Sequence, residues 1–106
     1  MTKVLYRKYY GNDLIVIEGH SGFDTVGKDI VCAAVSTLVC TLINCLHDER
    51  SDERIKLVRE VVNPGYVCFE VESFDFATER IKGVLDAVFT GFSMLADVYP
   101  DYISIE

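Results

Sequence analysis

One histidine and one cysteine stand in surroundings that could make a thiol nucleophile and its base. His20 follows one apolar run, and Cys32 lies near the start of another. A cysteine in the first turn of a helix is stabilised as the thiolate by the positive end of the helix dipole, and a nearby imidazole stabilises it further. A thiolate attacks carbonyl carbon atoms, so Cys32 could act as a nucleophile with His20 as its base.

Glycines punctuate the stretch that joins these two residues. Gly19, Ser21, Gly22 and Gly27 predict a loop over residues 21–28 that is mobile without a ligand. The pattern is not a phosphate-binding loop, because no lysine-serine or lysine-threonine pair closes it. We therefore interpret the glycines as turn residues.

Two polar residues near Cys32 are candidates for supporting roles. Asp29 is the expected N-cap of the following helix, because its carboxylate can accept the backbone N–H of Cys32. The same oxygens could instead orient the imidazole of His20, and we favour the cap because it needs only local structure. Ser36 is expected to be a satisfied buried hydroxyl, with a place in the lining of the active site as the alternative.

The remaining cysteines and the second histidine have simpler interpretations. Cys40, Cys45 and Cys68 are expected to be core residues, and even Cys32 could be only a small buried hydrophobe. His47 lies near a predicted helix C-terminus, where a cation favours the dipole. Without a CxxC pair or zinc-type spacing, we predict no metal, no cofactor and free thiols in a reducing cytoplasm.

Length and charge limit the possible functions. The chain has 106 residues, half of them hydrophobic, which predicts a single domain over residues 1–106. Its net charge of -7 opposes binding to nucleic acid and favours a basic partner, such as a lysine-rich peptide.

The hydrophobic pattern predicts a two-layer α/β sandwich of the α+β type. Two strands, a helix, two strands, a helix and a last strand should build a mixed sheet with both helices on one face. The expected elements are strands 3–10 and 14–18, helix 30–47, strands 54–62 and 66–72, helix 76–98 and strand 102–105. The turns should lie at residues 11–13 and 63–65, and residues 48–53 should form an exposed connection.

The first predicted helix is apolar around most of its circumference. Residues 30–46 carry no charge, but the run falls short of a membrane span and contains hydroxyl and amide side chains. We expect a deeply buried helix in a soluble protein. One sheet covers only one side of such a helix, so we predict a homodimer with this helix near the interface.

The central block resembles the signature of a known protease family. Gly19-His20-Ser21-Gly22, followed by Gly27-Lys28-Asp29-Ile30-Val31-Cys32-Ala33-Ala34-Val35-Ser36, is similar to the ribosomal-processing cysteine proteases of the Prp family. The resemblance implies a cytoplasmic peptidase that removes the N-terminal extension of a large-subunit ribosomal protein, L twenty-seven. It further implies a dyad of His20 and Cys32, an α/β homodimer, and a loop that orders around the substrate, with Gly19, Ser21, Gly22 and Gly27 as its substrate-loop residues. Ser21 stands where the family usually has alanine, which bears only on fine specificity.

A second hypothesis needs no catalysis. The chain could be a binding module for a ribosomal or ribosome-assembly partner, with Cys32 inert or at most redox-sensing. The dependence of Cys32 reactivity on His20 distinguishes the two hypotheses.

Overall fold

The computed structural model describes residues 1–25 and 27–106. Within them the chain forms five strands, two long helices and one short 3-10 helix. The strands are β1 (Thr2–Tyr9), β2 (Asn12–Glu18), β3 (Ile55–Asn63), β4 (Tyr66–Ser73) and β5 (Ile103–Ile105), and the helices are α1 (Ile30–Ser51), η1 (Asp75–Ala77) and α2 (Thr78–Val98). Val26, in the middle of the predicted loop 21–28, lies outside the described residues.

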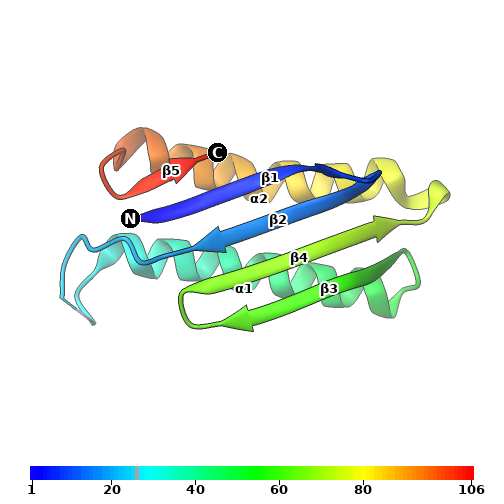
Figure 1. Ribbon diagram of the computed structural model, residues 1–106, viewed down its shortest axis with the longest axis horizontal. Helices are drawn as coiled ribbons and strands as arrows, with labels where there is room; N and C mark the ends of the chain where they lie inside the picture. The colour runs from blue at the N-terminus through cyan, green and yellow to red at the C-terminus, as the bar shows by residue number, and fades with distance from the viewer. Residues whose placement is uncertain (26) are drawn as a thin grey trace.

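The strands form one mixed sheet in the order β3-β4-β2-β1-β5. All neighbours are antiparallel except β1 and β5, which are parallel. Both long helices lie on the same face of this sheet, behind the strands in Figure 1. The predicted element order and two-layer architecture are therefore confirmed.

The first hairpin turns more tightly than the sequence pattern suggested. Tyr10 and Gly11 alone make the turn, with φ values of 49° and 83°. Asn12 already pairs with Tyr9, and Asp13 pairs with Lys8. Two consecutive positive φ angles are typical of the type I′ turn, whose twist matches that of the strands it joins. The predicted turn at 11–13 is thus displaced by one residue.

The second hairpin reaches the far end of the first because β2 pairs with β4. Pro64 and Gly65 form its turn, with Gly65 at φ 77°. Glu18, the last residue of β2, lies opposite Tyr66. One step beyond, the N–H of Gly19 donates to the carbonyl oxygen of Gly65 at 2.9 Å. This pairing brings the β3–β4 turn beside the loop that carries His20.

Helix α1 continues beyond its expected end at His47. Glu49 is buried, and its carboxylate accepts hydrogen bonds from Arg54 and Arg80 at 2.9–3.2 Å. A buried charge paired in this way is compatible with a helix that packs on the core. The prediction that residues 48–53 form an exposed connection is wrong for this reason: 48–51 belong to the helix.

The outer side of α1 is more open than expected. Val31, Val35, Leu42 and Leu46 are buried against the core, but Ile30 is 58% exposed. By length and composition alone α1 could cross a membrane, and only 22% of its apolar stretch is buried. In this fold it is a core helix on one side, so the expectation of a deeply buried helix is wrong for the single chain.

The core fills the space between the sheet and the two helices. The largest fully buried side chains come from both layers: Phe69 and Ile15 from the sheet, and Phe92, Leu42, Leu46, Ile81 and Leu85 from the helices. Burial of this apolar surface fixes α1 against the sheet. The start of α1 is therefore held near the end of β2 and the start of β4.

Candidate active site

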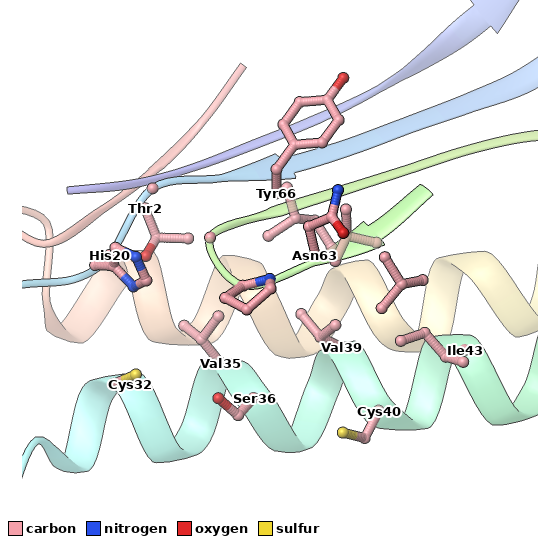
Figure 2. A pocket seen from close by; sticks show the side chains of 16 residues that line it. Thr2, His20, Cys32, Val35, Ser36, Val39, Cys40, Ile43, Asn63 and Tyr66 are labelled. Carbon is pink, nitrogen blue, oxygen red and sulfur yellow. The ribbon is translucent and has the colours of Figure 1, made fainter. Parts of the chain in front are cut away.

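A groove of about 460 Å³ runs between α1 and the β3–β4 turn. Its walls include His20 and Cys32 at one end and Ile43 at the other (Figure 2). Figure 2 shows the imidazole of His20 across the groove from the thiol of Cys32, at the N-terminal end of α1. Both predicted catalytic side chains therefore face the same cavity.

Cys32 is the third residue of α1, in its first turn. Its backbone N–H donates to Oδ1 of Asp29 at 2.7 Å, so Asp29 is the N-cap of the helix. The thiol is half-buried in the groove wall. A thiol at this position lies at the positive end of the helix dipole, which favours the thiolate.

His20 stands at the end of β2 on an irregular stretch of backbone. Gly19 before it has φ 91°, and the Met1 carbonyl lies where a β-carbon at this position would be. The imidazole is exposed. The imidazole of His20 and the thiol of Cys32 do not hydrogen-bond to each other. Hydrogen bonds between catalytic groups often tighten only when a substrate is bound, so the separation is compatible with catalysis.

Asp29 joins the loop to the helix. Its second oxygen, Oδ2, accepts the hydroxyl of Ser21 at 2.8 Å and the backbone N–H groups of Phe23 and Asp24 at 3.1 and 3.4 Å. Desolvation raises the pKa of Asp29, but these bonds and the one from Cys32 outweigh it and hold that pKa below its usual value. His20 is not among the donors to this carboxylate, so the geometry favours the cap over the orienting role.

A second cavity of about 470 Å³ adjoins the first at His20, Cys32 and Ser36. Its other walls come from the loop and the start of α1: Gly22, Asp24, Gly27, Asp29 and Ala33. The first cavity is bounded largely by aliphatic side chains, among them Val35, Val39 and Ile43. Two cavities thus meet at the predicted catalytic pair, and the second has two carboxylates, Asp24 and Asp29, in its wall.

Two expectations about α1 are wrong. Ser36 is exposed and lines both cavities, so the alternative role is the one its position supports. Cys40 is exposed in the apolar groove, and Cys45 is only half-buried. Ser36 and Cys40 are exposed because they follow Cys32 at four-residue steps, which places all three on one stripe of the helix beside the groove. Cys68 is buried as predicted.

Sequence reasoning missed the contribution of the β3–β4 turn. Asn63, Pro64 and Gly65 all line the groove, and a β-carbon on Gly65 would lie 2.8 Å from Nε2 of His20. The asparagine-proline-glycine pattern predicted a turn, but it did not predict that this turn would lie beside His20. Only the pairing of β2 with β4 places this turn beside His20.

The second histidine, His47, lines neither cavity. His47 hydrogen-bonds to Glu60 of β3, and Arg50 donates to the same carboxylate at 3.3 Å. Among the residues that the structure describes, no group of three or more His, Cys, Asp or Glu side chains could hold a metal ion.

A thiol at a helix N-terminus and an imidazole across an open groove form the arrangement that a cysteine hydrolase needs. The family model described as cysteine protease Prp matches residues 1–104. The chain therefore belongs to the cysteine protease Prp family.

Solved structures share its fold. The protein SMU.848 from Streptococcus mutans is 26% identical, with a TM-score of 0.69 over 100% of this chain and 92% of that one. The ribosomal processing protease Prp from S. aureus is similar in two complexes. The complex with a covalently linked product peptide is 18% identical with a TM-score of 0.72, and the complex with a substrate peptide is 17% identical with a TM-score of 0.67. Each covers 100% of this chain and 98% of the other. Comparison with curated proteins finds no significant match.

Proposed function

We propose that this protein is a ribosomal-processing cysteine endopeptidase in which Cys32 is the nucleophile and His20 the general base. The observation that carries the proposal is that both side chains line one end of the same groove, with Cys32 in the first turn of α1. Membership of a cysteine protease family supports the same chemistry.

The reaction would proceed through a thioester. As Sγ of Cys32 bonds to the scissile carbonyl carbon, His20 takes the thiol proton. The carbon–nitrogen bond then breaks, and the imidazolium returns that proton to the leaving amine. Water next attacks the thioester, giving one proton to His20, which passes it back to Sγ as the acid product leaves.

The oxyanion of the tetrahedral intermediate would be stabilised by the helix dipole rather than by the backbone N–H groups of Cys32 and Ala33. The N–H groups nearest the thiol are already committed, because those of Cys32 and Ala33 donate to Oδ1 and the carbonyl of Asp29. The positive end of the α1 dipole remains available to the developing charge.

The two cavities suggest the kind of peptide that would bind. Aliphatic residues in the first groove suit apolar substrate side chains, whereas the exposed carboxylate of Asp24 beside the second suits a basic one. The net charge of -7 also favours a basic peptide. These features fit the N-terminal extension of a large-subunit ribosomal protein, L twenty-seven, as the substrate. The S. aureus protease of the same fold was solved with substrate and product peptides.

We infer two further properties of the whole protein. The outer face of α1 is uncharged from residue 30 to 46, and its apolar stretch is 22% buried, which favours a homodimer that covers this face. Free cysteines and a ribosomal substrate favour the cytoplasm. Sedimentation at micromolar concentration should show a dimer, and a monomer alone would contradict this part of the proposal.

The substrate is tested by incubation with the unprocessed ribosomal protein. Wild type should remove the N-terminal extension, and Cys32→Ser and His20→Ala should not. Cys45→Ser is the matched control, because Cys45 lies on the same helix but lines neither cavity; it should still cleave. If wild type binds the ribosomal protein without cleaving it, the non-enzymatic binding module is the better description.

A further inference from the structure

The β3–β4 turn touches the imidazole that we assign as the base. A β-carbon on Gly65 would lie 2.8 Å from Nε2, 3.3 Å from Cε1 and 3.6 Å from Cδ2 of His20. These distances span the whole outer edge of the ring. The backbone of Gly65 therefore packs directly on the imidazole, with no room for a side chain between them.

The same turn also fixes the backbone that carries the histidine. The N–H of Gly19 donates to the carbonyl of Gly65 at 2.9 Å, which extends the β2–β4 pairing by one step. His20 is the next residue in the chain. Gly65 thus fixes the backbone before His20 by a hydrogen bond and limits the position of the His20 ring by contact.

This support matters because, among the described residues, no side-chain hydrogen bond of the loop reaches the ring. His20 is exposed, and it follows a glycine on a loop whose other contacts pass through Asp29 to Ser21, Phe23 and Asp24 rather than to the imidazole. A base must be held close to the thiol it deprotonates, and misplacement by about 1 Å can cost about 100-fold in rate.

We propose that Gly65 is a positioning residue of the active site, which holds the imidazole of His20 in place through bare backbone contact. The inference rests on the proposed function only in taking His20 as the base. It makes the β3–β4 hairpin a part of the catalytic apparatus. Asn63 and Pro64 of the same hairpin line the groove, so a bound peptide would contact the segment that supports the base.

Gly65→Ala tests the contact, and the chain supplies a matched control. Gly11 has φ 83° in the turn of the other hairpin, close to the 77° of Gly65, but a β-carbon there meets nothing within 4 Å. Both alanine variants carry the same backbone strain at positive φ. Only Gly65→Ala would also push the imidazole aside.

We expect kcat/KM for peptide cleavage to fall by about 100-fold in Gly65→Ala and by less than about threefold in Gly11→Ala. The rate of Cys32 alkylation, followed by peptide mass mapping across pH, should change in the same way. In a His20→Ala background, Gly65→Ala should have no further effect on that rate, because the ring it displaces is absent. Equal effects of the two glycine variants, or an undiminished effect without the imidazole, would overturn the inference.

A measurement on the wild type does not depend on whether a variant folds. An NMR cross-peak between a Gly65 Hα and the ring protons of His20 is expected, because one Hα of Gly65 points along the β-carbon direction toward the ring, and its absence would overturn the inference. Failure of the proposed function is distinguishable from both results, because His20→Ala would then leave Cys32 alkylation unchanged even with Gly65 intact.

Discussion

At the scale of single residues, one carboxylate links the loop to the thiol. Asp29 uses one oxygen for the N–H of Cys32 and the other for Ser21, Phe23 and Asp24. The local pattern of residues predicted the first contact, since an N-cap depends on neighbours three positions away. It did not predict the others, which depend on how the loop folds back.

Asp29→Asn separates these two sets of contacts. The amide oxygen can still accept the N–H of Cys32, but the NH₂ group would face three donors that it cannot accept from. We expect α1 to keep its helical signal by circular dichroism, while kcat/KM falls at least tenfold because the loop carrying His20 is released. Asp48→Asn, which alters an exposed carboxylate at the other end of α1 and outside both cavities, is the control. Wild-type activity in Asp29→Asn would show that the loop contacts have no catalytic role.

The residues that the sequence did not predict share a cause. Gly65 contacts His20 and Cys40 lines the groove only because β2 pairs with β4 and the β3–β4 turn lies over α1. Composition and periodicity describe each element by itself. Contacts between elements far apart in the chain depend on strand order, which no local pattern carried.

At the scale of elements, the sequence predicted most of the strand and helix positions that the structure shows. Alternation in the strands and three- and four-residue steps in the helices located every strand and both long helices, with ends displaced by up to four residues at α1. The displacement has a physical source: the charged residues after His47 looked solvent-exposed, yet Glu49 is buried in an ion pair with Arg54 and Arg80.

Two glycines of α2 test how closely the helices pack. A β-carbon on Gly83 meets nothing within 4 Å, whereas one on Gly91 would lie 2.7 Å from Cδ2 of Leu38 in α1. Gly83→Ala should raise the free energy of unfolding by about 1 kcal/mol, the difference in helix propensity. Gly91→Ala should gain much less, because Leu38 must leave its rotamer at a cost of about 1 kcal/mol. Equal gains in urea unfolding would show that α1 and α2 lie further apart.

The link between α1 and β3 should give the protein an acid-sensitive stability. The hydrogen bond from His47 lowers the pKa of Glu60, desolvation opposes this, and the charges of His47 and Arg50 lower it further. Because the folded-state pKa lies below the unfolded one, this stabilisation is complete above the ordinary glutamate pKa of about 4.3 and is lost as pH falls through the folded value.

Melting temperatures of wild type and Glu60→Gln should therefore differ most near neutral pH and converge toward about pH 3. Glu53→Gln, at an exposed position after α1, is the control and should follow wild type throughout. A difference between wild type and Glu60→Gln that stays constant with pH would contradict the assignment.

At the scale of the whole molecule, charge should control how fast a basic peptide associates. The net charge of -7 and the two carboxylates beside the second cavity create a field that attracts cations. We expect kcat/KM for a lysine-rich peptide to fall severalfold between about 0.05 and 0.5 M salt, as the screening length shortens to a few ångströms. A matched peptide with glutamine in place of lysine should change little. Equal salt dependence for both peptides would show that the acidic surface does not steer the substrate.

The account as a whole depends on activation of one thiol by one imidazole. Cys32 and Cys40 lie on the same stripe of α1 and line the same groove. Cys40 is exposed, whereas Cys32 is half-buried and therefore less accessible. Exposure alone would make Cys40 the faster to react.

The most direct measurement is therefore the rate of iodoacetamide alkylation at each of these two cysteines near neutral pH, in wild type and in His20→Ala. We predict that Cys32 reacts faster than Cys40 in wild type, and that loss of the imidazole slows Cys32 while leaving Cys40 unchanged. Faster reaction at Cys40 in wild type, or a Cys32 rate that does not depend on His20, would contradict the assignment of these residues as nucleophile and base.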